Sequence, residues 1–378
     1  MRKKITFFLP SLEPGGTERN VVNLVNHINK ERYAVSLVLG DKEGDFVKEV
    51  KADIPIINLK ASSSLGLFFA LVRYFKNQKP DIFISAFPRI NVICIAAKIL
   101  SGVQTKIVIT EHSVFSMLPV IAKTFWRRAF ARFFMSILAA TLYPKADSIV
   151  CVSQGIADDL AKIANVSGKM KVIYNAIIND EIYQLAKEPT AHPWFSDQKI
   201  PVVVAVGRLV ACKDYPTLLK AFGRVLKTHP ARLIVLGSGP ERDKLISIAR
   251  YMGLSEHTDF VGFKKNPYAY MKKSSVLALS SLQEGFGNVI IEAMACGTPV
   301  VSTNCPAGPG EIIEHMKNGI LVPVGDETAL ARAILKILHD PLLMEKFSAE
   351  GKATAKYFSV QKSVSEYEKV FQTLTTNS

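Results

Sequence analysis

The chain has 378 residues, 48% of them hydrophobic and 21% charged, with 47 basic and 33 acidic residues that leave a formal net charge of +14. This length predicts two or three domains, each large enough to bury its own core, and the hydrophobic content excludes a disordered chain. No run of about 18 apolar residues is present, which excludes a spanning helix, whereas the basic excess leaves nucleic acid, an anionic membrane surface and an anionic small molecule open.

Five scattered cysteines indicate a reducing compartment. They form no C-x-x-C pair and have no histidine at metal-ligand spacing, so we expect free thiols in a cytoplasmic protein. The first residues, MRKKITFFLP, have the charge profile of a secretory signal, but their apolar part is short, contains Pro10 and lacks a small-residue cleavage site. We therefore interpret residues 5–9 as a first buried strand.

Short apolar runs alternate with amphipathic stretches along the first half of the chain. Because these runs are continuous rather than alternating, they predict a parallel sheet covered by helices on both faces, that is, a doubly wound α/β domain. The expected strands are residues 5–9, 33–40, 81–86, 106–110 and 147–153, and the expected helical stretches are 21–28, 46–52, 92–100, a long segment after 110, and 156–164.

The polar stretch 179–199, with two prolines, predicts a linker. A second series of about five or six strand–helix units follows, so the fold class is α/β with two Rossmann-like domains of similar size in tandem. The expected strands are 200–207, 231–239, 259–263, 276–281, 299–303 and 320–324, and the expected helices are 217–229, 241–253, 268–274, 288–296 and 329–338.

In an open α/β sheet the ligand lies beyond the carboxyl ends of the strands, so the loops there carry the candidate site residues. The first such loop contains Gly15 and Gly16 and leads into a helix. Paired glycines let the backbone approach a ligand, and a helix start favours an anion. The loop is neither a Walker loop nor a G-x-G-x-x-G fingerprint, and an ordinary turn stays open.

His112 follows the strand expected at 106–110. A histidine at the carboxyl end of a strand can donate to a substrate oxygen or stabilise a leaving charge. The alternative is a structural histidine tied to a neighbouring carboxylate such as Glu111.

Arg208 and Lys213 follow the strand expected at 200–207 and come just before a helix. Two fixed cations beside a helix N-terminus form a clamp for a diphosphate. An ordinary pair of surface cations is the alternative.

The most specific pattern contains Glu284, Phe286, Gly287, Asn288 and Glu292. The glycine-rich turn offers backbone N–H groups at a helix start, suited to a phosphate or to sugar hydroxyls. The spacing places Glu284 on the loop and Glu292 about two turns into the helix. A carboxylate accepts two hydrogen bonds in a fork, which matches the vicinal hydroxyls of a ribose or hexose.

These motifs resemble those of the retaining nucleotide-sugar glycosyltransferases of family four (group 1), and they match in order over most of the chain. The string E-G-F-G-x4-E-A-M-A-x-G-x-P-V-V begins at Glu284, and a G-R-L element precedes Lys213. The other matching motifs are G-G-T-E-R at 15–19, G-S-G-P-E at 237–241, F-V-G-F at 260–263 and N-G-x-L-V-P at 318–323.

The resemblance implies the GT-B fold, in which two Rossmann-like domains face each other across a cleft. Residues 1–180 plus about 362–378 would then form an acceptor-binding domain, and 190–361 a nucleotide-sugar-binding domain. The last helix is expected to return to the first domain.

The resemblance also implies a role for each candidate residue. Arg208 and Lys213 would hold the donor diphosphate, and Glu292 the ribose hydroxyls. The transferred sugar and its phosphate would contact Glu284 and the backbone of Phe286, Gly287 and Asn288, while Gly15 and Gly16 would approach the diphosphate or acceptor and His112 the anomeric centre.

The chemistry implied by the family is a same-face substitution with retention, for which we name no general base. No D-x-D triad is present, so we expect no metal and no other cofactor, with a UDP-sugar as the donor. The segment 304–313 is similar to bacterial transferases that extend lipid-linked saccharides with N-acetylhexosamines or hexoses for surface glycans. A UDP-sugar 2-epimerase on the same fold, or a non-catalytic nucleotide-sugar-binding partner, are the alternatives.

Residues 113–146 contain no acidic residue, and their cations are interleaved with aromatic side chains. This composition is typical of an interfacial helix on an anionic membrane, and it predicts a protein held peripherally on the inner face of the cell membrane. A buried helix with a solvated basic face is the alternative. Nucleic acid is not expected, because no recognised binding motif accompanies the charge.

Overall fold

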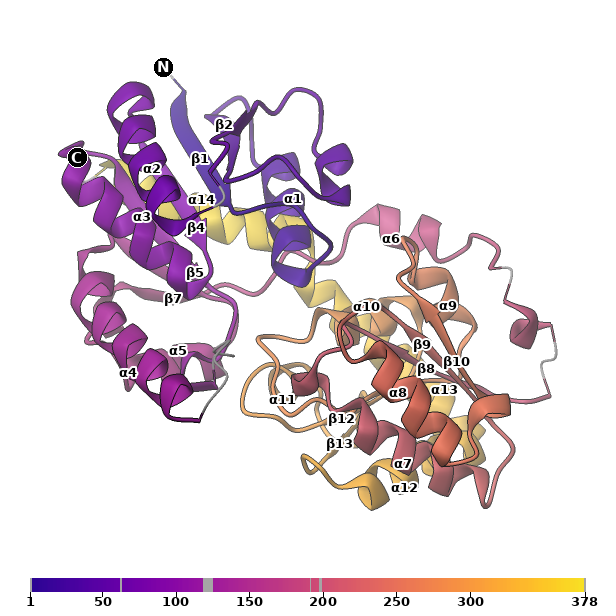
Figure 1. Cartoon of the computed structure of the whole chain (residues 1–378). Coiled ribbons are helices and arrows are strands. Elements are labelled where there is room, and N and C mark those ends of the chain that lie inside the picture. The colour runs from indigo at the N-terminus through magenta and orange to yellow at the C-terminus, as the bar shows by residue number, and fades with distance from the viewer. Residues whose placement is uncertain (1, 62, 118–124, 191, 197–198, 377–378) are drawn as a thin grey trace. The chain divides into compact units, whose positions relative to one another are not determined.

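The computed structural model describes residues 2–61, 63–117, 125–190, 192–196 and 199–376, without the side chains of 125–132. The chain forms two compact units (Figure 1). The first unit comprises residues 1–177 and 360–378, and the second comprises 178–359. The chain therefore leaves the first unit at 177/178, where 180 was expected, and re-enters it at 359/360, where 361/362 was expected.

The first unit is built on a seven-stranded parallel sheet in the order β3-β2-β1-β4-β5-β6-β7. Its helices are α1 (Gly16–His27), α2 (Ser64–Gln78), α3 (Pro88–Ser101), α4 (Phe125–Leu142), α5 (Gln154–Ala161) and α14 (Val360–Thr376), with 3₁₀ turns η1 (Asp45–Glu49), η2 (Phe115–Met117), η3 (Tyr143–Lys145) and η4 (Ser167–Lys169). The strands are β1 (Lys3–Leu9), β2 (Tyr33–Leu39), β3 (Ile56–Asn58), β4 (Ile82–Ala86), β5 (Lys106–Glu111), β6 (Ser148–Cys151) and β7 (Met170–Val172).

Both faces of this sheet are covered, as the continuous apolar strands predict. Phe7 belongs to a core cluster formed with α1 and α14, whereas the next residue, Phe8, stacks on Phe83 with ring centroids 5.9 Å apart. Tyr367 and Phe371 of α14 are fully buried in the first cluster. The yellow helix α14 in Figure 1 accordingly packs against α1, although the whole second unit separates them in the sequence.

Two expectations for the first unit are wrong in detail. The stretch 46–52, expected as helical, is only the short turn η1, which begins after Gly44 in a positive-φ conformation. Sequence analysis also missed β3, β7 and α2. The strands β3 and β7 lie at the two edges of the sheet and have only three residues each, none of them buried, so they lack the buried apolar run by which the other strands were found.

The second unit contains a six-stranded parallel sheet in the order β10-β9-β8-β11-β12-β13. Its helices are α6 (Asp180–Leu185), α7 (Tyr215–Leu226), α8 (Arg242–Tyr251), α9 (Tyr268–Lys273), α10 (Asn288–Cys296), α11 (Pro309–Ile312), α12 (Glu327–His339) and α13 (Pro341–Ala355), with 3₁₀ turns η5 (Pro193–Phe195), η6 (Ala211–Lys213), η7 (Ser255–His257) and η8 (Lys356–Phe358). The strands are β8 (Val202–Val206), β9 (Arg232–Leu236), β10 (Thr258–Gly262), β11 (Val276–Leu279), β12 (Val300–Thr303) and β13 (Ile320–Val322).

The expected linker at 179–199 is instead part of the second unit where the structure describes it. It contains α6, and His192 is buried with its Nε2 atom 3.0 Å from a carboxylate oxygen of Asp259. Phe195 packs edge-on against Tyr270, and Asn266 donates to the carbonyl of Leu185 at 2.9 Å. The aromatic residues in this polar stretch therefore anchor it to the unit that follows.

Among the helices that the structure describes, none is both long enough and apolar enough to cross a membrane.

Replacement of Phe371 by Ala is expected to destabilise the first unit by about 3–5 kcal/mol, because it empties a fully buried ring site against Tyr33. Hydrogen exchange followed by mass spectrometry should show faster exchange in residues of the first unit. Phe347→Ala, at an equally buried site of the second unit, is the matched control and should accelerate exchange there. Faster exchange confined to the second unit in Phe371→Ala would contradict this assignment.

Candidate active site

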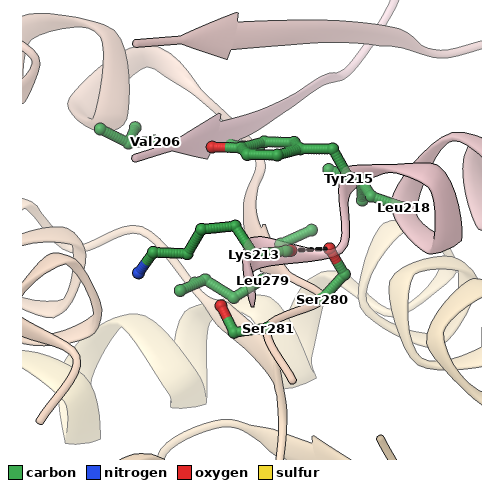
Figure 2. A pocket seen from close by; sticks show the side chains of 9 residues that line it. Val206, Lys213, Tyr215, Leu218, Leu279, Ser280 and Ser281 are labelled. Carbon is green, nitrogen blue, oxygen red and sulfur yellow. Dashed lines mark hydrogen bonds between the residues drawn. The ribbon is translucent and has the colours of Figure 1, made fainter. Parts of the chain in front are cut away.

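The second unit has a topological switch point between β8 and β11. Strand β8 pairs with β9 on one side and with β11 on the other, so the chain leaves their carboxyl ends in opposite directions and opens a crevice there. A small cavity occupies this position (Figure 2). It is lined by the ends of β8 and β11, by the start of α7, and by Lys213, Ser280 and Ser281.

Lys213 and Glu284 form a close ion pair beside this cavity. The Nζ atom of Lys213 lies 2.6 and 2.7 Å from the two carboxylate oxygens of Glu284, and Ser281 donates its hydroxyl to the same carboxylate at 2.7 Å. The Glu284 side chain is only 8% exposed. This buried carboxylate is thus fully partnered, and it holds the lysine ammonium at one fixed place.

The backbone around Lys213 is fixed by the neighbouring strand. Ser280 donates its hydroxyl to the carbonyl of Lys213 at 2.9 Å, the dashed line of Figure 2, and the N–H of Leu282 donates to the carbonyl of Cys212 at 2.8 Å. Tyr215 donates to the carbonyl of Gly207 at 3.1 Å, and burial raises its pKa, with the nearby Glu284 carboxylate adding to the effect. Sequence analysis did not identify Tyr215, Ser280 or Ser281, although the two serines are the last residues of the strand expected at 276–281; the observed β11 ends at Leu279, so both follow it.

Arg208 lies on the same β8–α7 connection as Lys213 but is exposed, and the part of the chain described here provides no ion pair for it. The two cations of the expected clamp therefore differ: one is held by a carboxylate and one projects into solvent. Both are set just before α7, whose first residue is Tyr215.

The loop before α10 presents backbone rather than side chains. Phe286 is 2% exposed, and its ring packs on Phe358 with centroids 5.5 Å apart, so it contributes to the core. Gly287 adopts φ 97° and caps α10, which begins at Asn288. Glu292 is consequently the fifth residue of the helix, just over one turn in, and not two turns as expected; it is half-buried.

Gly237 shows why glycine is needed in the neighbouring loop. It has φ 145°, and a Cβ atom there would lie 1.9 Å from the carbonyl oxygen of Gly207. The loops after β8 and β9 are also joined by hydrogen bonds, among them the one from the N–H of Leu209 to the carbonyl of Ser238 at 2.9 Å. The turn at 237–241 thereby fixes the backbone on which Arg208 stands.

In the first unit, the switch point lies between β1 and β4. The loop after β1 ends at Gly15, an extended residue that caps α1, and Gly16 is the exposed first residue of that helix. The N–H of Leu12 donates to the carbonyl of Glu43 at 2.8 Å and braces the loop. After β4, Phe87 adopts φ 77°, a strained conformation of the kind found at ligand sites, which sequence analysis did not anticipate.

His112 follows β5, next to β4, and is buried. Burial lowers its pKa to about 3, so the ring is neutral at ordinary pH. Its Nε2 atom is 3.0 Å from the hydroxyl of Thr110, and that hydroxyl donates to the carbonyl of Ser85 at 3.1 Å. Since the hydroxyl has one hydrogen, Nε2 must be the donor, and Nδ1 is left as an acceptor. Sequence analysis predicts that His112 donates to a substrate oxygen or stabilises a leaving charge; in this tautomer, Nδ1 is suited to accept from a hydroxyl group.

Glu111 is not the partner of His112, so the alternative of a histidine tied to that carboxylate is wrong. Tyr143 donates its hydroxyl to Glu111 Oε1 in a short hydrogen bond, and Asn91 donates to the same atom at 2.7 Å. The other oxygen, Oε2, is buried without a hydrogen-bond partner among the described residues. Burial raises the pKa of Glu111 to about 7, against the lowering effect of its two donors.

Within the described ranges, no three histidine, cysteine or acidic side chains gather closely enough to hold a metal ion.

Two family models match this chain, one for each half. The model described as Glycosyltransferase Family 4 matches residues 14–181, and the one described as Glycosyl transferases group 1 matches 187–354. A Campylobacter jejuni protein, N-acetylgalactosamine-N,N'-diacetylbacillosaminyl-diphospho-undecaprenol 4-alpha-N-acetylgalactosaminyltransferase, is 30% identical over 94% of this chain and 96% of its own. The chain belongs to the family 4, group 1 glycosyltransferases.

A further relative and two solved structures are also similar to this chain. A second Campylobacter jejuni protein, a GalNAc-alpha-(1->4)-GalNAc-alpha-(1->3)-diNAcBac-PP-undecaprenol alpha-1,4-N-acetyl-D-galactosaminyltransferase, is 28% identical over 94% of this glycosyltransferase and 95% of its own chain. Anabaena HepE, solved in complex with UDP and glucose, superimposes with a TM-score of 0.80 at 21% identity, covering 98% and 100% of the two chains. Sucrose-phosphate synthase from Thermosynechococcus elongatus gives 0.83 at 20% identity, with both chains covered fully. The fold of this glycosyltransferase is thus GT-B.

Gly237→Ala is expected to lower the kcat/KM of transfer by about a hundredfold, because the new methyl group displaces the loop that carries Arg208. Gly253→Ala is the matched control. Gly253 also has positive φ, 70°, but no atom lies within 4 Å of its Cβ position, so it should lose about 1 kcal/mol of stability and keep its turnover. Equal kinetics in the two variants would contradict the close-approach argument.

Glu111→Gln is expected to make the free energy of unfolding less dependent on pH between about pH 4.5 and 7. The pKa of Glu111 is raised to about 7 in the folded state, so its stabilising contribution is full below the unfolded value of 4.5 and is lost as the pH rises through 7. The expected difference between wild type and variant across this window is at most about 3 kcal/mol.

Denaturant unfolding at several pH values measures this difference. His112 acts in the opposite direction, because its pKa is lowered to about 3, but it is present in both proteins and cancels. Cys151, which faces Glu111, has its pKa raised to about 12 and does not titrate in the window. A wild type and variant whose stabilities change in parallel from pH 4.5 to 8 would contradict the assignment.

Proposed function

We propose that this glycosyltransferase moves a sugar, an N-acetylhexosamine or a hexose, from a UDP-sugar to a lipid-linked saccharide during surface-glycan assembly. It does so with retention of configuration and without a metal. The observation that carries the proposal is the Lys213–Glu284 pair at the switch point between β8 and β11, where an α/β sheet binds its ligand.

The donor site would be assembled from the loops of the second unit. Arg208 and Lys213 hold the diphosphate, and Glu292 on α10 accepts from the ribose hydroxyls. Glu284 and the backbone at Phe286, Gly287 and Asn288 hold the transferred sugar and its phosphate. Support comes from the fixed ammonium of Lys213, the solvent-facing Arg208 and the half-buried start of α10 at Asn288.

The ion pair explains how the site would work on an anionic leaving group. As the glycosidic bond breaks, negative charge develops on the departing diphosphate, and cations already fixed beside it stabilise that charge without reorganisation. Glu284 keeps Lys213 in place before the donor arrives and can then share the ammonium with a phosphate oxygen. No protein nucleophile or general base is assigned.

The acceptor side would be formed by the first unit. Gly15 and Gly16 let the backbone approach the diphosphate or the acceptor, and neutral His112 accepts from a sugar hydroxyl near the anomeric centre through Nδ1. The names of both Campylobacter relatives specify undecaprenol-linked acceptors, and this supports a lipid-linked saccharide here.

A lipid-linked acceptor supports peripheral attachment to the cytoplasmic face of an anionic membrane through residues 113–146. Phe133, Phe134 and Ile137 of α4 are all exposed. Residues 118–124, with Lys123, lie outside the described residues, as do the side chains of Arg127, Arg128 and Arg132. Metal independence rests on the chemistry of the two cations, which supply the charge that a metal would otherwise contribute.

Lys213→Ala and Glu284→Ala are each expected to lower kcat by at least about a hundredfold, since one removes a cation from the leaving group and the other releases it. A panel of UDP- and GDP-sugars with a lipid-linked acceptor, read by mass spectrometry, measures transfer and identifies the donor. Lys227→Ala, an exposed lysine elsewhere in the second unit, is the control and should keep its activity. Near-wild-type turnover by either site variant would refute the proposal.

A further inference from the structure

The positive charge of the first unit is concentrated in one stretch. Residues 54–146 contain 12 basic residues and only two acidic ones, Asp81 and Glu111. Asp81 accepts from the N–H of Lys4 at 2.7 Å and lies 3.7 Å from the ammonium of Lys3, while Glu111 is buried. Neither carboxylate is free to offset the cations on the surface of this stretch.

This stretch forms one layer of helices. The connections from β3 to β4 through α2, from β4 to β5 through α3 and from β5 to β6 through α4 all step across the sheet in the same direction, so right-handed crossovers place these helices on one face. Helix α3 contacts both of the others (Figure 1). Helices α1 and α14 pack on each other in the opposite layer. Among the described residues, Arg73, Lys76 and Lys98 of the acid-free layer form no ion pair.

Large apolar side chains protrude from the same layer. In the described part of the first unit, eight large apolar residues are exposed, and seven of them lie on these three helices. They are Leu65 and Phe69 of α2, Ile99 and Leu100 of α3, and Phe133, Phe134 and Ile137 of α4.

Helix α2 combines both features along one face. Leu65, Phe69, Arg73 and Lys76 are spaced by four, four and three residues, so they share a stripe, and all four are exposed. The first half of this stripe is apolar and the second half is cationic. Such a stripe suits the boundary between lipid headgroups and acyl chains.

We propose that the α2–α3–α4 layer is a single docking surface for an anionic lipid bilayer, of which α4 forms only one part. This deepens the proposed function and rests on the membrane attachment stated there. A second copy of the chain is a poor occupant, because two acid-free cationic surfaces repel each other. Nucleic acid would pair with the cations but would leave the protruding leucine, isoleucine and phenylalanine side chains in water.

The test compares binding to sucrose-loaded vesicles of phosphatidylcholine with and without phosphatidylglycerol. Arg73→Ser, Lys76→Ser and Lys98→Ser together should weaken binding to the anionic vesicles by about a hundredfold, since each cation near such a surface contributes about fivefold. Leu65→Ser with Phe69→Ser should weaken it by at least about tenfold. The matched control, Lys220→Ser, Lys227→Ser and Arg250→Ser, changes exposed cations of the second unit and should bind as wild type does.

Turnover on a water-soluble acceptor separates this inference from the proposed function. The α2 and α3 variants should keep wild-type turnover there, because none of their changed residues belongs to the candidate site. If the wild-type protein does not bind anionic vesicles but still transfers sugar to the water-soluble acceptor, the docking-surface proposal is wrong and the proposed transferase function stands. Binding lost only on substitution of Arg127, Arg128 and Arg132 would restrict the surface to α4 and overturn the extension to α2 and α3. A change of oligomeric state with unchanged vesicle binding, measured by analytical ultracentrifugation, would assign the layer to a second copy.

Discussion

The ion pair between Lys213 and Glu284 is the interaction on which the arrangement of the candidate site in the second unit depends. It joins the loop after β8 to the loop after β11, and a pair so little exposed is stable only when its geometry is enforced and its remaining hydrogen-bond positions are filled. The structure meets both conditions. Ser281 fills a position on the carboxylate, and Ser280 and Leu282 tie the lysine loop to the strand beside it.

Both units contain a parallel sheet with a switch point, but the groups near the two switch points differ in charge. In the second unit, the crevice at the switch point is bordered by charged groups, and this suits a ligand that carries charge. In the first unit, His112 is neutral and Glu111 takes up its proton near neutrality, because both are buried without a countercharge. Polar but uncharged surroundings suit sugar hydroxyls. The proposed division between a donor unit and an acceptor unit thus corresponds to a difference in local charge as well as in sequence.

Much of this architecture could be predicted from the sequence, because continuous apolar runs and glycine-rich loops have local causes. The contacts between distant residues could not. Lys213 and Glu284 are 71 positions apart, and no local pattern shows that they pair. Glu111 accepts hydrogen bonds from Asn91, on the adjacent helix α3, and from Tyr143, in the turn after α4.

The composition of 179–199 predicts a linker, and only the packing of this segment on Tyr270 and Asp259 shows that it belongs to the second unit. The bounds of α10 were predicted correctly, and with its first residue at Asn288 the helix reaches Glu292 after just over one turn, so the expected distance of two turns was too long.

The return of α14 to the first unit affects the order in which the chain can fold during synthesis. The second unit is continuous, and all of it has been made once residue 359 is added. The first unit still lacks Tyr367 and Phe371 of its core at that moment, so its α1 face stays uncovered until α14 has left the ribosome. Although its N-terminal part is synthesised first, the first unit completes its fold after the second, and a chain truncated near residue 360 would carry a finished second unit and an incomplete first one.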